Sequence, residues 1–382
     1  MSHDNAASKG SSKKGLEPNE VTPIGFPGPV NLLLITGRSD WGLAPRQVIE
    51  ILKLIKPIGA RVAVAAPSEP PHGNEFRKSA SNFISITRDE FSITDFFRLS
   101  RAVKNLDINI IHSHGRIGGL YSRLLGIKTG IPVIHTFHGL AKRDGVVGKI
   151  YSIAERILAR AKFVGTFSTN SEYEQALAAG VMLEGQAPLI IEKAINIKAF
   201  PRKKKASFGG TKLRIGGIAR SGSANGPDLL LKLANETGDI AHWSSSGLNK
   251  EHLAKYGHVP EDFEAVTSPS DLVGWLQSLD VFVCTSRHEG HANGVLEALA
   301  AGVPCVLAQI PAHQEIAGAQ AAILFEPEDT MAFRSIMQNL REDVGLRNSL
   351  VSNGTYYLER FHNWDKYIED ILEMYRSGLR GW

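Results

Sequence analysis

The chain has 382 residues and a formal net charge of +4, with 43% hydrophobic and 21% charged residues, which is ordinary for a globular protein and excludes a disordered or fibrous one. No apolar run approaches the ~20 residues that span a bilayer, and the length exceeds what one hydrophobic core usually organises, so two domains are expected. Residues 1–29 are polar and rich in Ser, Lys, Gly and Pro, without the apolar segment of a secretory signal, and are predicted to form a disordered tail.

From residue 30 onward, short apolar segments alternate with helical patterns. The strand-like segments of the first half are residues 30–36, 60–67, 108–114, 132–139, 163–168 and 188–196. Near-continuous apolar strands separated by helices indicate a parallel sheet covered on both faces. Residues 30–200 are therefore predicted to form an α/β, doubly wound, Rossmann-like domain.

A basic segment with Pro and Gly, residues 197–212, interrupts this pattern, which then resumes. Residues 201–362 are predicted to form a second Rossmann-like domain, and a helix over 363–382 is predicted to pack back on the first. Ligands of such sheets bind beyond the carboxyl ends of the strands. Two domains of this kind that face each other predict an interdomain cleft.

Charge is distributed unevenly along the chain. Residues 1–205 hold 29 basic and 17 acidic residues, a net charge of +12, and the remainder has a net charge of −8. A basic first half suggests an anionic partner, either a membrane surface or nucleic acid. Nucleic acid is the weaker expectation because no interleaved aromatics or recognition module are present.

A helical pattern over residues 145–163 carries an apolar stripe of Ile150, Ile153, Ile157 and Leu158 with basic residues beside it. This pattern is typical of a helix that packs on a core, and it also fits docking to an anionic bilayer.

The two cysteines of the chain bear on the cellular compartment of the protein. Cys284 and Cys305 fall in apolar strand patterns, as expected of small buried thiols in a reducing cytoplasm.

The segment "SRHEGHANGVLEALAAG" places Glu289 and Glu297 on either side of a short polar turn. The turn is made of mostly small residues, Gly290, His291, Ala292, Asn293 and Gly294. Backbone N–H groups at the start of the following helix favour an anion such as phosphate, and carboxylates accept hydrogen bonds from sugar hydroxyls. Alternatively, Glu289 caps the helix and Glu297 is a solvated helix residue.

This segment resembles the glutamate–seven residues–glutamate motif of family 4 glycosyltransferases, retaining enzymes with the two-domain GT-B fold. Ala292 stands where the most similar variant of the motif has proline. The resemblance implies that Glu289 holds hydroxyls of the donor sugar and that Glu297 holds the nucleotide ribose. It also implies that backbone N–H groups near Asn293 and Gly294 contact the donor diphosphate.

The family pairs an arginine with a lysine after the first strand of the second domain, where they neutralise the diphosphate. Arg220 matches the arginine, but Asn225 occupies the lysine position. An amide carries no charge, so leaving-group stabilisation should be weaker unless another cation supplies it. Arg287 and Arg38 are the candidates.

In the first domain, the loop "TGRSDWGLAP" carries Gly37 and Gly42, and the corresponding family loop lies under the donor phosphates. Four histidines stand near the ends of two strands, at His112, His114, His135 and His138. A zinc site is disfavoured because neither Asp nor Cys accompanies them at ligand spacing. His138 matches a histidine at the edge of the family's active site, and the others are expected to be hydrogen-bonded residues at strand ends.

The sequence thus predicts a retaining glycosyltransferase that moves a sugar from a nucleotide-diphosphate donor to a hydroxyl of a glycan or lipid-linked acceptor. The resemblance implies His138, Arg220 and Glu289 as the catalytic residues, with no metal and no cofactor besides the donor. UDP is the first expectation for the nucleotide and GDP the second. A cytoplasmic location with peripheral membrane contact is expected. The alternatives are a degenerate, non-catalytic nucleotide-sugar-binding protein and an epimerase or phosphorylase of the same fold.

Overall fold

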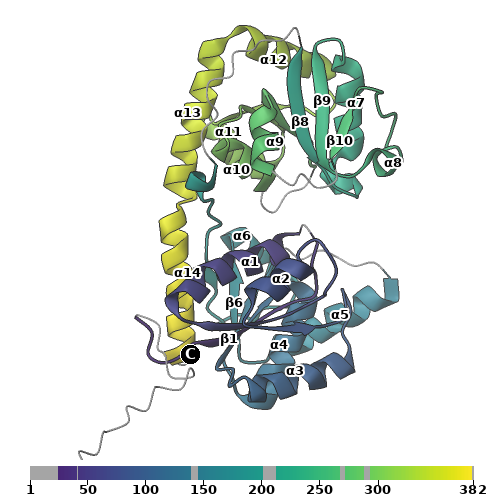
Figure 1. Cartoon of the computed structure of the whole chain (residues 1–382). Helices are drawn as coiled ribbons and strands as arrows, with labels where there is room; N and C mark the ends of the chain where they lie inside the picture. Colours follow the sequence, from purple (N-terminus) through teal and green to yellow (C-terminus); the bar gives the residue numbers. More distant parts are fainter. Residues whose placement is uncertain are drawn as a thin grey trace, which may run out of the picture. The chain divides into compact units, whose positions relative to one another are not determined.

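The computed structural model describes residues 25–40, 42–138, 145–200, 212–266, 272–287 and 293–380. The chain forms two compact units (Figure 1). Unit 1 comprises Met1–Ile191 and Ile368–Trp382, and unit 2 comprises Glu192–Tyr367. Most of the predicted tail, residues 1–24, lies outside the described residues.

Unit 1 is built on a seven-stranded parallel sheet with the strand order β3-β2-β1-β4-β5-β6-β7. Its strands are β1 (Asn31–Thr36), β2 (Arg61–Ala66), β3 (Asn82–Ser85), β4 (Ile110–His114), β5 (Val133–Thr136), β6 (Val164–Phe167) and β7 (Leu189–Ile190). The strand order reverses direction between β1 and β4. Such a reversal opens a crevice at the carboxyl ends of the two strands, where ligands of this fold bind.

Helices cover both faces of this sheet, with α1 and α2 on one face and α3 and α4 on the other (Figure 1). The helices of unit 1 and its boundary are α1 (Leu43–Ile55), η1 (Lys56–Ile58), α2 (Gly73–Ser79), α3 (Ile93–Asn105), α4 (Gly115–Thr129), α5 (Gly145–Leu158), α6 (Asn170–Ala178) and α14 (Trp364–Arg380). The C-terminal part of α14 belongs to unit 1, where Tyr375 is fully buried.

Unit 2 holds a six-stranded parallel sheet with the order β10-β9-β8-β11-β12-β13. Its strands are β8 (Leu213–Ala219), β9 (Ala241–Gly247), β10 (Glu264–Val266), β11 (Val281–Cys284), β12 (Cys305–Ala308) and β13 (Ala322–Phe325). Its helices are η2 (Ile197–Ala199), η3 (Ser223–Asn225), α7 (Pro227–Thr237), α8 (Lys250–Leu253), α9 (Leu272–Ser278), α10 (Asn293–Ala300), α11 (Pro311–Gly318), α12 (Thr330–Glu342) and α13 (Val344–Phe361).

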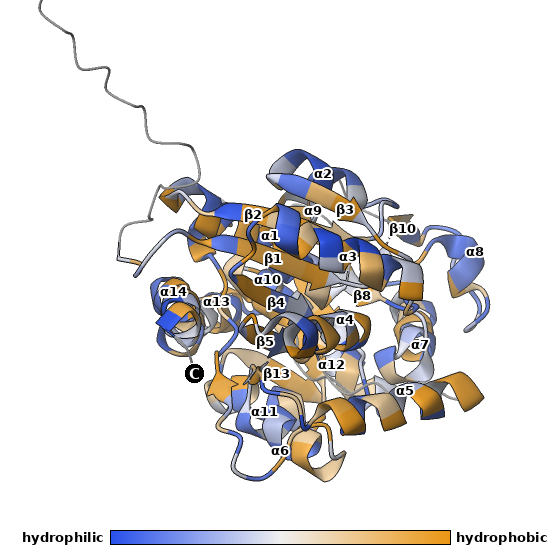
Figure 2. Cartoon of the chain, turned by 90° about the horizontal axis from the view of Figure 1, so that it is seen from below, coloured by the Kyte–Doolittle hydropathy of each residue, from blue (hydrophilic) through white to orange (hydrophobic). Residues whose placement is uncertain are grey.

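The central strands form the two cores, as a parallel sheet covered on both faces requires. Every residue of β1 is buried, and Figure 2 shows the apolar residues along β1 and β2. The predicted α/β class with parallel sheets is confirmed. Cys305 is buried in β12 as expected, and Cys284 is only half-buried at the end of β11.

The structure corrects three predictions of local structure. The strand expected over 188–196 is reduced to Leu189–Ile190, an edge strand. The edge strand Asn82–Ser85 was not predicted, because an edge strand needs no continuous apolar run. The core-packing interpretation of the α5 stripe is wrong for Ile150, Ile153 and Ile157, which are exposed, whereas Leu158 is buried.

Candidate active site

The loop after β8 is shaped by two glycines in the left-handed region. Arg220 follows the strand and is exposed. Gly222 has φ +100° and Gly226 has φ +61°, with the short helix η3 between them. A Cβ on Gly226 would lie 1.9 Å from the Thr285 carbonyl oxygen, so this position requires glycine for both conformation and space.

Hydrogen bonds join this loop to the loop after β11, the neighbouring strand. The Thr285 hydroxyl donates to the Gly226 carbonyl at 2.9 Å. The Arg287 N–H donates to the Ala224 carbonyl at 2.8 Å. The two loops are therefore held together at the carboxyl edge of the unit 2 sheet.

A small pocket lies between these loops and the start of α10. Its lining includes Ile218, Arg220, Asn225, Phe282, Cys284, Ser286, Gly294 and Val295. It thereby brings together three of the predicted site residues. Its volume of about 20 Å³ is room for roughly one water molecule, so only a small group of a ligand would fit inside it.

Helix α10 begins next to this pocket. Asn293 is buried, and a Cβ on Gly294 would lie 2.5 Å from Ile218 Cδ1. Glycine at this position lets the helix N-terminus, with its unpaired N–H donors, approach β8 closely. Four predicted site residues, Glu289, Gly290, His291 and Ala292, lie outside the described residues.

Glu297 lies one turn into α10 and is only 4% exposed. The alternative that it is a solvated helix residue is therefore wrong. Glutamate is seldom buried in a protein core, and a helix such as α10 packs through its apolar residues without needing a carboxylate. The ribose-binding role that the family motif implies for Glu297 stays a prediction.

The two other candidate cations for the diphosphate are already paired with aspartates. Arg287 donates to both carboxylate oxygens of Asp228, at 2.8 and 2.7 Å, and these hydrogen bonds hold the Asp228 pKa below its usual value. Arg38 donates to Asp40 in the loop after β1. Arg220 forms no ion pair with any other residue that the structure describes, so it carries the least compensated charge of the three.

The carboxylate of Asp40 lies just before the start of α1, in the glycine loop that is predicted to lie under the donor phosphates. The Gly42 N–H donates to Asp40 Oδ1 at 2.9 Å, and a Cβ on Gly42 would lie 2.8 Å from that oxygen. At Gly37, a Cβ would lie 2.6 Å from Cβ of Ile117 in α4. Glycine is thus needed at position 37 for the close approach to a helix, whereas at position 42 only the movable end of the Asp40 side chain is in the way.

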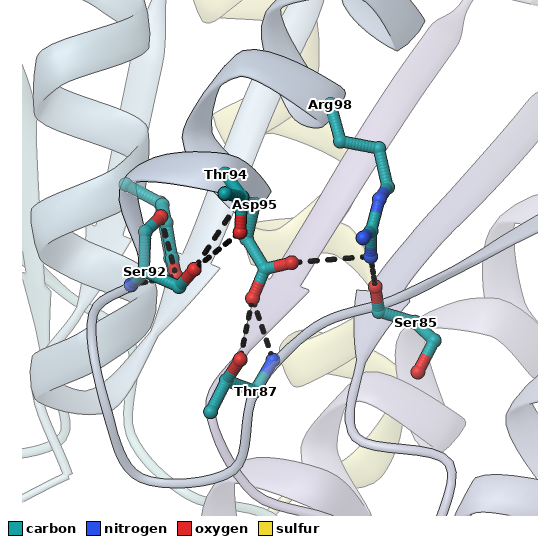
Figure 3. Close-up of polar contacts among 7 residues, drawn as sticks. Ser85, Thr87, Ser92, Thr94, Asp95 and Arg98 are labelled. Atoms are coloured by element: carbon teal, nitrogen blue, oxygen red, sulfur yellow. Dashed lines mark hydrogen bonds and ion pairs between the residues drawn. The ribbon is translucent and has the colours of Figure 1, made fainter.

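The loop between β3 and α3 lies beside Gly37, since the Asp89 N–H donates to the Gly37 carbonyl at 2.9 Å. Figure 3 shows how Asp95 of α3 holds this loop. Asp95 accepts from the N–H and the hydroxyl of Thr87, both at 2.8 Å, and pairs with Arg98 at 3.1 Å. Asp95 was not singled out from the sequence, although the Ser-x-x-Asp pattern that begins at Ser92 is a known signature of a helix start.

Two of the strand-end histidines are held in the core by hydrogen bonds, as expected. His112 contacts the Tyr375 hydroxyl at 2.6 Å and the Thr136 hydroxyl at 2.7 Å. His135 contacts the Ser113 hydroxyl at 3.0 Å. Burial holds the pKa of both imidazoles well below the usual value, so both are neutral at pH 7.

The remaining two histidines contact each other. His114 Nδ1 lies 3.2 Å from His138 Nε2, and the rings are stacked with centroids 5.5 Å apart. His114 is buried, and burial lowers its pKa to about 3, so it is neutral at pH 7. This contact couples the protons of the two rings, because whichever of the two nitrogens donates, the other must accept. Sequence alone could not pair them, because the register of β4 against β5 decides it.

No group of three or more His, Cys, Asp or Glu side chains in the described ranges is arranged to hold a metal ion. Within the same ranges, no helix is both long and apolar enough to cross a membrane.

Two family profiles match the chain. "Glycosyltransferase Family 4" matches residues 44–182, and "Glycosyl transferases group 1" matches residues 197–343. Together they span about three quarters of the sequence. The chain therefore belongs to glycosyltransferase family 4 and is a glycosyltransferase with the GT-B fold, as the sequence motif predicts.

Individual relatives are more distant. A D-inositol 3-phosphate glycosyltransferase of Acidothermus cellulolyticus is 24% identical over 71% of this chain and 67% of its own length. A glycosyltransferase of Rickettsia africae superposes with a TM-score of 0.74 at 16% identity and covers 93% of this chain and 100% of its own. Anabaena HepE, in complex with UDP and glucose, has a TM-score of 0.74 at 13% identity over 91% of this chain and 99% of its own.

Proposed function

We propose that this glycosyltransferase moves a sugar from a nucleotide-diphosphate donor to a hydroxyl of a glycan or lipid-linked acceptor, with retention of configuration. The observation that carries the proposal is the meeting of Arg220, Asn225 and Gly294 around one pocket at the carboxyl edge of the unit 2 sheet. A cation beside a helix N-terminus favours a diphosphate. In this proposal, Arg220 and the α10 backbone stabilise the leaving diphosphate.

The other roles follow the family motif. Glu297 holds the ribose, Glu289 holds the donor sugar, and His138 borders the reacting centre. His114 orients His138 through their 3.2 Å contact. UDP is the proposed nucleotide, and the UDP and UDP-glucose complexes of HepE support it.

Nucleotide binding is tested by thermal unfolding of the whole chain with UDP, GDP, ADP and CMP in turn. A nucleotide at 100 times its dissociation constant adds about 2.7 kcal/mol to the free energy of unfolding. We expect UDP to stabilise the protein and E297A to remove most of that effect. Stabilisation by another nucleotide would replace UDP in the proposal, and stabilisation by none would reject nucleotide binding.

Transfer is then tested with UDP-sugars and a panel of acceptors, and the anomeric configuration of the product is read by NMR. D-inositol 3-phosphate belongs in the panel because relatives of similar sequence are named D-inositol 3-phosphate glycosyltransferases. A lipid-linked glycan is the acceptor class that we propose. An inverted product would reject retention, and UDP binding with hydrolysis but no transfer would reject these acceptors.

One observation favours a degenerate, non-catalytic protein as the second candidate. The Asn225 amide donates to the Ser221 carbonyl at 2.7 Å, so the position that is lysine in the family serves here to hold its own loop. A degenerate protein would bind the nucleotide without turnover of any UDP-sugar.

A further inference from the structure

Helix α5 exposes an apolar face to solvent. Five of its residues are between 56% and 74% exposed, namely Val146, Val147, Ile150, Ile153 and Ile157, which we call the α5 apolar face. They are five of the thirteen large hydrophobic side chains that are exposed in the described part of the chain. Single exposed apolar residues are normal, whereas a cluster on one element marks an interaction surface.

The helical repeat aligns these residues. At about 100° per residue, Val146, Ile150, Ile153 and Ile157 fall within about 60° of one another around the axis. Figure 2 shows apolar residues along most of α5. The result is a narrow stripe that follows the whole helix.

The opposite side of α5 is firmly attached to unit 1. Glu155 is 4% exposed and pairs with Arg116 of α4 at 3.0 Å. The Tyr151 hydroxyl accepts from the Phe91 N–H at 3.1 Å, and Leu158 is buried in the core of the unit. The helix is therefore docked through its inner side, and the exposure of the stripe is a property of the folded unit.

Cations lie beside the stripe. Lys149 and Arg156 are exposed and fall about 40–60° beyond the edge of the stripe, both on the same side. Arg160 and Lys162, just beyond the helix, are exposed as well. Glu155 is the only acidic residue between positions 145 and 162, and it is buried and paired. The outer face of α5 is thus apolar and cationic without an acidic group.

From this arrangement we infer that the α5 apolar face docks on a lipid bilayer that contains anionic headgroups. An apolar stripe with basic residues at its edge inserts at the depth of the headgroups, where lysine and arginine meet lipid phosphate. A second copy that packs through the same face would bring cations against cations, because this face holds no acidic group besides the buried and paired Glu155. The inference is independent of the reaction proposed above, because it concerns a face that carries none of the proposed catalytic residues.

Vesicle flotation with the whole chain tests the inference. Vesicles of phosphatidylcholine alone are compared with vesicles that also contain phosphatidylglycerol. We expect binding to the anionic vesicles, weaker binding at high salt, and little binding to phosphatidylcholine.

The I150Q/I153Q variant should bind anionic vesicles at least about tenfold more weakly than the wild type, since two isoleucine side chains are no longer transferred from water into the bilayer. M331Q/V344Q is the matched control, because Met331 and Val344 are comparably exposed, at 74% and 56%, but lie in unit 2. It should bind as the wild type does. K149Q/R160Q should lose most of the preference for anionic lipid.

Three results would overturn the inference. The first is equal vesicle binding by I150Q/I153Q and the wild type. The second is binding to neither kind of vesicle. The third is self-association in analytical ultracentrifugation that I150Q/I153Q abolishes, which would make a second copy the occupant. Unchanged circular dichroism and melting of the variants would show that each folds, as expected for exposed positions.

Discussion

The loops that follow the first strand of the two sheets, β1 in unit 1 and β8 in unit 2, both place an arginine within two residues of the strand end, but the two arginines differ in their pairing. Arg38 pairs with Asp40, two residues further along its own loop. Arg220 forms no ion pair with a residue in the described ranges, and Arg287 beside it is committed to Asp228. Two loops with similar sequences thus present different charges to a ligand. In the proposed function, the pairing of each arginine, more than its presence, decides which loop attracts the donor diphosphate.

Alanine substitution of each arginine in turn tests whether its pairing distinguishes the two loops. We expect R220A to lower kcat/KM by roughly 100- to 1000-fold, the effect of losing one stabilising group for a developing negative charge. R38A should cost no more than about tenfold, because Asp40 already compensates that charge. Initial rates over a range of donor concentrations measure both, and equal losses would show that the ion pairs do not distinguish the loops.

Alanine substitution of the loop glycines compares the backbones of the two loops. G226A should lower the free energy of unfolding by about 2–4 kcal/mol, because the new Cβ meets the Thr285 carbonyl in a left-handed conformation. G37A should cost about 1–3 kcal/mol, since its Cβ meets the Cβ of buried Ile117, so the loop or helix α4 has to shift slightly.

Urea unfolding measures both changes. G318A is the matched control in unit 2, since no atom lies within 4 Å of its new Cβ, and it should stay within about 0.5 kcal/mol of the wild type. A G226A protein as stable as G318A would mean that the two interlocked loops shift without cost.

Acid should destabilise unit 1 through its buried histidines. The His114 pKa is about 3 in the folded chain and about 6.5 when unfolded. The unfolded state therefore binds more protons between these values, so stability is present above pH 6.5 and is lost as the pH falls. At pH 5 the loss from this residue alone is about 2 kcal/mol.

Hydrogen exchange resolved by residue, at pH 7 and pH 5 after correction for the intrinsic rates, measures this loss separately in each unit. H114Q removes the titrating group, so its stability should fall less between the two values. Identical pH dependence in H114Q and the wild type would exclude His114 as a source of acid sensitivity.

The smallest expected effect restores the family's lysine. N225K adds a cation to the loop after β8 but gives up the hydrogen bond to Ser221, which costs about 1 kcal/mol. We expect kcat to rise several-fold, up to about tenfold, and N225D to lower it. Measurable turnover by the wild type that neither change alters would mean that position 225 does not face the diphosphate.

The fold class and the family could both be predicted from the amino-acid sequence. Apolar segments such as 30–36 and 60–67 predicted parallel strands because strands covered on both faces must be apolar throughout. The family was predicted from the resemblance of the segment around Glu289 and Glu297 to a known motif, which is contiguous in the sequence and can therefore be recognised without a structure. Gly226, by contrast, was not singled out, since its need for glycine arises from the Thr285 carbonyl of another loop.

Which charged groups are paired and which apolar groups are covered could not be predicted, because both depend on contacts between distant segments. The contact between His114 and His138 depends on the register of two strands, and the pairing of Arg287 with Asp228 joins segments far apart in the sequence. The stripe on α5 looked equally suited to a core or to a membrane, because amphipathic periodicity marks a face without saying what covers it. The ion pair of buried Glu155 with Arg116 turns the other side of α5 inward and leaves Ile150 and Ile153 in solvent.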